Sequence, residues 1–314
     1  LMAGSARAQQ GARAGEWSTY GGDLGHTRYA PLEQITADNF DELEVAWRFK
    51  TDNLVPVPEF RFQSTPLMVD GVLYSTGGSR RAVMALDAAT GELLWVYSVD
   101  EGQRGAAAPR QLSGRGLAYW PGDGNNGARV VYVTPGYRLV ALDAATGRPV
   151  PVFGDAGMVD LKQGNDQAVD LVTGEVGLHA TPIVAGDVVV VGAAHRTGGN
   201  PRSRANVKGY VRGYDVRTGE RLWIFHTIPR PGQFGRDTWL ADSAVYTGNT
   251  GVWGQISVDV DLGLVYLPVE AATGDYFVSN RPGDNLFAES LVAVDLYTGE
   301  RRWHYQLVHH GIWD

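Results

Sequence analysis

A ten-residue phrase that occurs four times constrains the fold of this chain more than any other feature. It reads LDAATGELLW from Leu86, LDAATGRPVP from Leu142, YDVRTGERLW from Tyr214 and VDLYTGERRW from Val294. Each copy has an apolar strand end, an Asp that can accept hydrogen bonds from turn amides, a Thr-Gly pair whose Gly supplies a positive φ, and a second strand. Each copy therefore predicts a β-hairpin, and four copies of one phrase predict a repeat architecture.

Tryptophan follows the Gly by four residues in three of the copies, at Trp95, Trp223 and Trp303. The second copy carries Pro151 at that place, and Trp47, in LEVAWRF, matches the same outer-strand position of an earlier unit. The copies are roughly 55 to 80 residues apart, which fits four-stranded propeller blades with loop insertions, each blade burying its face against its neighbours. We therefore predict that these Trp side chains wedge between adjacent blades.

The rest of the chain favours the same all-β class. β-Branched and apolar residues cluster in short runs, and helical periodicity is nearly absent. The runs predict strands at Val69–Thr76, Val130–Thr134, Asp187–Gly192 and Leu264–Val269. A β-sandwich with accidental repeats is the alternative, which the four copies of one hairpin phrase disfavour.

Charge and cysteine content exclude several classes of function. The net charge is −8, so no basic face is available to neutralise phosphates, and a small molecule is a better partner than nucleic acid. The chain has no Cys, which excludes disulfides, thiolate zinc sites, iron–sulfur ligation and covalent c-type haem. Any redox chemistry must therefore use a non-covalent cofactor. No apolar run is long enough to span a membrane.

The N-terminal residues differ in composition from the rest. Residues 1–15 are small and polar, and Ala6-Arg7-Ala8 resembles the small-residue end of a cleaved signal peptide. We expect a disordered tail over residues 1–15, a single propeller domain over residues 16–314, and a periplasmic location.

The repeat Ala-x-Asp-x-x-Thr-Gly-x-x-x-Trp is similar to the tryptophan-docking motif of the pyrroloquinoline quinone (PQQ)-dependent dehydrogenases. The stretch from Gly251 to Asp314, with GVWGQISVDVDLGLVYLPV, RPGDNLFAESLVAVD and WHYQLVHHGIWD, resembles the membrane-associated glucose and quinate dehydrogenase branch of that family. The resemblance implies an eight-bladed propeller with PQQ on its axis, of which this chain would be the N-terminal four to five blades. It also implies that the enzyme needs the later blades.

The resemblance assigns cofactor contacts to particular residues. PQQ is a flat ortho-quinone with three carboxylates, so its site needs a flat support, cations and hydroxyls. The family Trp that stacks under the quinone corresponds to Trp253, the Arg beside it to Arg115, and a Glu contact to Gln63. Without the resemblance, these would read as another docking Trp, a solvated Arg and a plain strand residue. Further cofactor contacts are expected at Thr181, His195 and Arg196.

The resemblance also implies a catalytic base and a metal site. Asp314, at the end of HHGIWD, matches the family Asp that accepts the alcohol proton. Glu270 offers a carboxylate next to Ala271, where the family has an Asn ligand, so Ca²⁺ or another hard cation is expected at Glu270 and Asp314. No acidic residue stands in Arg204–Val207, near the family's other metal-site Glu. Pro109-Arg110 replaces the adjacent cysteines of the methanol dehydrogenases.

The function implied is oxidation of an alcohol or aldose hydroxyl by hydride transfer to the quinone, with Asp as general base and electrons passed to ubiquinone or a cytochrome. The alternative is a non-catalytic PQQ-like propeller that acts as a binding scaffold. A scaffold has no need for Trp253, Arg115 and the ending His-Gly-Ile-Trp-Asp together, so we favour the enzyme.

Overall fold

The fold is almost entirely β-structure. The computed structural model describes residues 11–13, 15–54, 59–196, 203–274 and 277–312. The α-helices within these ranges are single turns, α1 (Gly102–Ala106) and α2 (Ser243–Tyr246). Short 3₁₀ turns occur at Phe40–Glu42, Asp52–Leu54, Arg236–Thr238 and Val278–Asn280. No helix in the described part of the chain combines the length and the apolar character needed to cross a membrane.

The strands of the described residues form four antiparallel sheets of four strands each, and strands that follow one another in the chain are neighbours in the sheet. The first blade contains β1 (Leu67–Val69), β2 (Val72–Gly77), β3 (Ala82–Asp87) and β4 (Leu93–Tyr97). The second contains β5 (Ala118–Trp120), β6 (Arg129–Val133), β7 (Arg138–Asp143) and β8 (Met158–Asp160). The third contains β9 (Ile183–Ala185), β10 (Val188–Val191), β11 (Val211–Asp215) and β12 (Arg221–Phe225). The fourth contains β13 (Ser257–Asp259), β14 (Leu264–Val269), β15 (Ser290–Asp295) and β16 (Arg301–Gln306).

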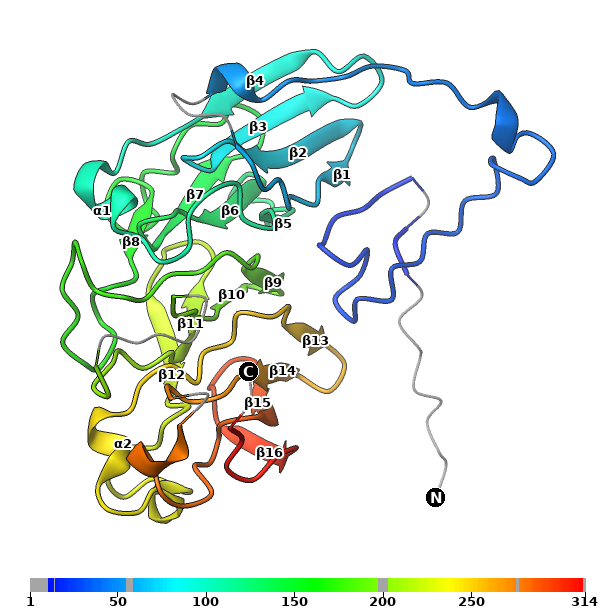
Figure 1. The fold of residues 1–314 in the computed structure, drawn as a ribbon. Coiled ribbons are helices and arrows are strands. Elements are labelled where there is room, and N and C mark those ends of the chain that lie inside the picture. The colour runs from blue at the N-terminus through cyan, green and yellow to red at the C-terminus, as the bar shows by residue number, and fades with distance from the viewer. Residues whose placement is uncertain (1–10, 14, 55–58, 197–202, 275–276, 313–314) are drawn as a thin grey trace.

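The four blades follow one another in chain order along an arc (Figure 1). This arrangement confirms the prediction of an all-β, partial propeller. The strand predicted at Leu264–Val269 is β14 as expected, and those near residues 130 and 188 are β6 and β10, with ends shifted by a residue.

The strand predicted over Val69–Thr76 is wrong as a single element. It is interrupted by Asp70 and Gly71, whose φ angles are 49° and 78°, and β1 and β2 pair across them. Two successive positive φ values belong to the tight hairpin turns whose twist matches that of the flanking strands. The apolar residues on both sides of the turn conceal it in the sequence.

The repeated phrase forms the predicted hairpin. Asp87 Oδ1 accepts hydrogen bonds from the Ala89 amide at 3.0 Å, the Thr90 amide at 2.8 Å and the Thr90 hydroxyl at 2.9 Å. These bonds to Thr90 hold the pKa of the Asp87 carboxyl below its usual value. The paired bonds to Thr recur in the other copies, at Asp143, Asp215 and Asp295.

Trp95 and Trp223 dock between blades as predicted, whereas Trp303, in the last described strand β16, is 40% exposed. Trp95 Nε1 in the first blade donates to the Ala144 carbonyl in the second at 3.0 Å, and Trp223 Nε1 in the third donates to Leu296 in the fourth at 2.9 Å. Trp47 makes the same bond to Ala88 at 3.1 Å, so it occupies the outer-strand position inferred from its sequence. Each indole lies over the hairpin Gly of the blade that receives it.

The second copy of the phrase docks through a different residue. Phe153, two positions after Pro151, is fully buried, and its ring would lie 3.3 Å from a Cβ on Gly219 in the third blade. The amide of Gly154 donates to the Thr218 carbonyl at 2.7 Å. An aromatic wedge is therefore kept, although not at the position that the aligned phrases indicate.

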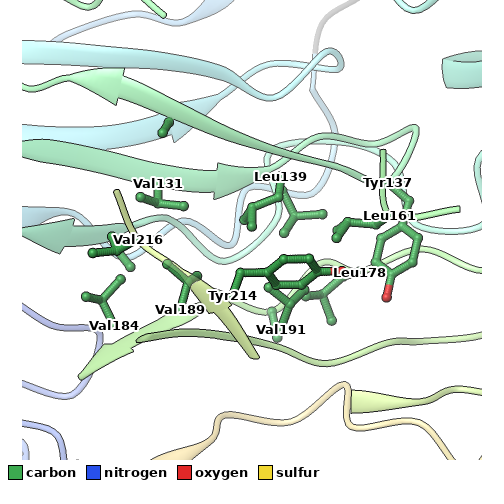
Figure 2. Packing of buried hydrophobic residues seen from close by; sticks show 14 of the residues in the cluster. Val131, Tyr137, Leu139, Leu161, Leu178, Val184, Val189, Val191, Tyr214 and Val216 are labelled. Carbon is green, nitrogen blue, oxygen red and sulfur yellow. The ribbon is translucent and has the colours of Figure 1, made fainter. Parts of the chain in front are cut away.

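The core lies between the blades. Figure 2 shows the cluster between the second and third blades, where Val131 and Leu139 face Val189, Val191 and Tyr214. Because both faces of these inner and middle strands are covered, they read as nearly continuous apolar runs rather than alternating patterns.

The N-terminal segment links the first blade to the fourth. Trp17 pairs with Met68 in β1, while the Leu24 carbonyl accepts the Val258 amide of β13 at 2.9 Å. His26 Nε2 donates to the Ile256 carbonyl at 2.8 Å. The segment therefore contacts the inner strands of two blades that are distant in the chain.

Tryptophan docking predicts a specific sensitivity at the hairpin glycines. Gly299→Ala is expected to destabilise the full-length protein by about 2–4 kcal/mol, because its φ is +69° and the new Cβ would lie 2.6 Å from Trp223 Cδ2. Gly263→Ala is the matched control, since its φ is +64° but no atom lies within 4 Å, and about 1–2 kcal/mol is expected. Urea unfolding followed by tryptophan fluorescence measures both. Equal losses would show that the indole does not restrict position 299.

Candidate functional site

A cavity of about 800 Å³ lies where the chain segments leading into the inner strands converge. Its walls come from the segments before β1, β5, β9 and β13, and from the segments that follow β10 and β14. Five of the residues predicted from the sequence line it: Gln63, Arg115, Arg196, Trp253 and Glu270. The remaining lining includes Phe60, Arg61, Ala106–Leu112, Gly114, His179 and Asn249.

Arg115 is placed by a loop that only glycines on either side allow. Gly114 and Gly116 have φ of +65° and +133°, and a Cβ on Gly116 would lie 2.9 Å from the Thr65 carbonyl. The Arg115 amide donates to the His179 carbonyl at 2.7 Å, and the Arg115 carbonyl accepts the Thr65 amide at 2.9 Å. Arg115 is thus held by backbone bonds to segments of the first and third blades.

A buried guanidinium organises the loop that precedes Arg115. Arg81 is 2% exposed and donates to the carbonyls of Leu112 at 3.0 Å, Leu178 at 2.7 Å and Arg110 at 3.0 Å. It also donates to Val133 at 2.7 Å. Burial lowers the pKa of Arg81 to about 10, so the side chain stays charged at neutral pH. Sequence analysis missed Arg81, since nothing in its local pattern distinguishes it from a surface Arg.

Trp253 forms a flat wall together with two neighbours. The Arg115 guanidinium carbon lies 5.2 Å from the centre of the Trp253 ring, a cation–π distance. The His179 ring is nearly parallel to the indole, at 17°, with the ring centres 5.8 Å apart. The structure therefore brings Trp253 and Arg115 together, as the sequence predicts, and adds His179.

His179 is uncharged at neutral pH. Burial, together with the nearby Arg110, Arg115 and Arg81 guanidinium groups, lowers the pKa of His179 to about 3. A neutral ring stacked near Trp253 adds aromatic surface to the site without adding charge.

The charge of the lining favours an anion. Among the described residues, four guanidinium groups line the cavity, from Arg61, Arg110, Arg115 and Arg196, against the single carboxylate of Glu270. Arg196 also lies near Glu175, with Nε 3.5 Å from its carboxylate. In a cavity with this excess of positive charge, a ligand with several carboxylates is stabilised by charge-assisted hydrogen bonds.

Two predicted contacts do not line the cavity. The Thr181 hydroxyl donates to Gln255 Oε1 at 2.7 Å and is 5% exposed. His195 Nε2 lies 3.9 Å from Glu175 Oε2, and burial lowers the pKa of His195. Neither residue is among those that line the cavity.

Glu270 shares its part of the wall with Asn249, which sequence analysis missed. Asn249 is 9% exposed and its Nδ2 donates to the Ala271 carbonyl at 3.2 Å. Its Oδ1 is shielded from solvent and has no hydrogen-bond partner in the described part of the chain. Such a buried acceptor costs about 1–3 kcal/mol when unsatisfied. No group of three His, Cys, Asp or Glu side chains within the described ranges could hold a metal ion by itself.

Asp314, the predicted base, lies outside the described residues. The segment ahead of it is anchored at Gly311, whose carbonyl accepts a hydrogen bond from Arg281 Nη2 at 2.6 Å. Arg281 is fully buried and also donates to Asn285 Oδ1 at 2.8 Å.

We next compared the sequence and the fold with those of known proteins. Residues 17–314 match the family model described as glucose/ethanol/alcohol dehydrogenase, beta-propeller domain, of the PQQ type. The chain belongs to this PQQ dehydrogenase family. The predicted family membership is therefore confirmed.

Several relatives are larger quinoprotein dehydrogenases. The glycerol dehydrogenase large subunit of Gluconobacter oxydans is 32% identical, with 96% of this chain and 40% of the relative covered. The quinohemoprotein alcohol dehydrogenase ADH-IIG of Pseudomonas putida is 33% identical, with 96% and 39% covered. The solved structure of that enzyme from Pseudomonas putida HK5 superposes with a TM-score of 0.78 at 31% identity, covering 96% of this chain and 41% of that one. This PQQ-family chain spans about two-fifths of the length of these relatives.

Proposed function

We propose that the full-length protein is a PQQ-dependent dehydrogenase that oxidises the hydroxyl group of an alcohol or an aldose. The observation that carries this proposal is the grouping of Trp253, His179 and Arg115 in an arginine-rich cavity. A flat aromatic wall with a guanidinium beside it suits a planar, polyanionic quinone, and the four lining guanidinium groups suit its carboxylates.

Each lining residue has a distinct task in this proposal. Trp253 and the neutral His179 would support the plane of PQQ, and Arg115 would donate N–H groups to a carboxylate and to the quinone oxygens. Gln63 would donate its amide to a further carboxylate. When bound, PQQ supplies an electrophilic quinone carbonyl carbon that can accept a hydride.

We assign a hard cation, Ca²⁺ or a similar ion, to the part of the wall around Glu270. The Glu270 carboxylate and the Asn249 amide oxygen are ligand types that such ions prefer, and both residues line the cavity. Asp314 is assigned as a further ligand and as the base that accepts the substrate hydroxyl proton.

The remaining parts of the proposal concern partners and location. We infer that the electrons pass to ubiquinone or to a cytochrome, because quinone reduction must be followed by reoxidation for turnover. A periplasmic location follows from the signal-like Ala6-Arg7-Ala8.

Reconstitution tests the proposal. The full-length protein, loaded with PQQ and Ca²⁺, is expected to reduce an artificial dye when given alcohols or aldoses, and to show no dye reduction without PQQ. Tryptophan fluorescence quenching reports PQQ binding in the same samples. Tight PQQ binding without dye reduction across a panel of alcohols and aldoses would favour the scaffold instead. Absence of PQQ binding would reject the proposed function altogether.

A further inference from the structure

We propose that Asn249 supplies an amide-oxygen ligand to a hard cation held together with Glu270, in place of the amide that position 271 lacks. The inference deepens the proposed function, because the cation would occupy the same cavity as PQQ. Position 271, where the resembling family has Asn, is Ala271 here.

One end of the Asn249 carboxamide is hydrogen-bonded, and among the described residues the other is not. Its Nδ2 is engaged with the Ala271 carbonyl at 3.2 Å, which fixes the orientation of the amide. Its Oδ1 is buried and without a hydrogen-bond partner in the part of the chain that the structure describes. An oriented amide oxygen in a cavity wall, next to a carboxylate, is a suitable ligand for Ca²⁺ and similar ions.

The backbone of Asn249 is hydrogen-bonded on both sides. The Asn249 amide donates to the Val207 carbonyl at 2.9 Å, and the Asn249 carbonyl accepts the Gly209 amide at 2.7 Å. Asn249 also forms a β-bridge with Ala272. Bonds to the third blade and to the segment that follows β14 therefore fix the position of the Asn249 backbone. The side-chain oxygen is thus preorganised as a ligand.

Glu270 lies next to the segment that carries Asn249. The Glu270 amide donates to the Gly251 carbonyl at 3.0 Å, and a Cβ on Gly251 would lie 2.9 Å from Glu270 Oε1. Glu270 and Asn249 therefore approach one another through Gly251, two residues after Asn249. Glycine at 251 leaves the carboxylate its space.

A purely conformational role for Asn249 makes a different prediction. Asn249 has φ of 59°, in the left-handed region that Asn and Gly tolerate better than other residues. Asn249→Gly keeps this backbone conformation and removes the whole carboxamide, both its oxygen and its bond to the Ala271 carbonyl. Asn249→Asp keeps both the conformation and an oxygen ligand. The two variants therefore separate a backbone requirement from a ligand.

Terbium luminescence provides a readout that does not depend on turnover. Tb³⁺ is titrated into the full-length protein, with and without PQQ, and its emission is excited through tryptophan; Ca²⁺ is then added in competition. We expect Asn249→Gly to weaken Tb³⁺ and Ca²⁺ binding by about 10- to 100-fold, and Glu270→Ala to weaken it at least as much. Asn249→Asp adds a negative charge to the ligand oxygen, so it should bind both ions more tightly than wild type.

Asn165→Gly is the matched control. Asn165 is 2% exposed and its Oδ1 also lacks a partner among the described residues, but it does not line the cavity. The affinity of the Asn165→Gly protein for Tb³⁺ and Ca²⁺ should equal that of wild type. Far-UV circular dichroism checks that each variant is folded, and Asn249→Asp carries the test if Asn249→Gly is not.

Two results would overturn the inference. One is a wild-type affinity for Tb³⁺ and Ca²⁺ in Asn249→Gly. A wild-type affinity in Asn249→Asp, despite its added charge, would count in the same way. The other is the absence of Ca²⁺-displaceable Tb³⁺ both with and without PQQ. Because PQQ binding is measured separately by fluorescence quenching, loss of PQQ binding with ion binding intact would reject only the proposed function.

Discussion

Replacing Asp314 with Asn is expected to lower kcat of the full-length, PQQ-loaded protein by about 10²- to 10⁴-fold, the usual contribution of a positioned general base. The amide has nearly the shape of the carboxylate but cannot accept the proton of the substrate hydroxyl. PQQ affinity should change much less, because Trp253 and Arg115 remain.

Dye reduction and PQQ fluorescence titration measure the two quantities on the same protein. Asp261→Asn is a suitable control, since Asp261 is exposed at the turn before β14 and does not line the cavity. Equal kcat in wild type and in Asp314→Asn would remove Asp314 from the mechanism and direct attention to another base.

Replacing Arg115 with Ala is expected to weaken PQQ binding from about 30-fold to several thousand-fold. This range corresponds to about 2–5 kcal/mol, the cost of truncating one partner of a hydrogen-bonded charge pair. Arg115→Lys should fall between wild type and Ala, because an ammonium keeps the charge but lacks the planar fork of donors.

Fluorescence titration with PQQ measures the affinity of each variant. Arg148→Ala is the control, because Arg148 is an exposed residue of a hairpin turn outside the cavity. If Arg115→Ala binds PQQ within twofold of wild type, the guanidinium beside Trp253 does not contact the cofactor.

Much of the blade architecture was predictable because hairpins are local. Asp87, Thr90 and Gly91 lie within five residues, and their turn bonds need no distant partner. The Trp positions were predictable for the same reason, because a docking indole has a fixed offset from its hairpin. Phe153 departs from the aligned position because docking requires an aromatic ring at Gly219 and not a particular residue number. In the second copy the connection between β7 and β8 is longer, so the ring comes from a different residue.

The family motif brought Trp253, Arg115 and Glu270 to attention before their contacts were known, and the structure places them around one cavity. Thr181 and His195 were expected at the cofactor on the same basis, but they are not among the residues that line the cavity, and their side chains lie against Gln255 and Glu175. Both residues lie in loop segments outside the strands, where the direction of a side chain depends on packing that a sequence motif does not record.

The sequence by itself determined the all-β class, the repeating hairpins, the docking tryptophans and the membership of a quinoprotein family, because each depends on short-range patterns. Only the tertiary structure decided that Arg81 holds the loop before Arg115, that a neutral His179 lies near Trp253, and that Asn249 lines the same cavity as Glu270. These partners come from segments that are far apart in the chain, and the packing of one blade on the next brings them together. No local sequence pattern predicts such contacts, because they depend on the packing of side chains between blades and not on the neighbouring residues in the sequence.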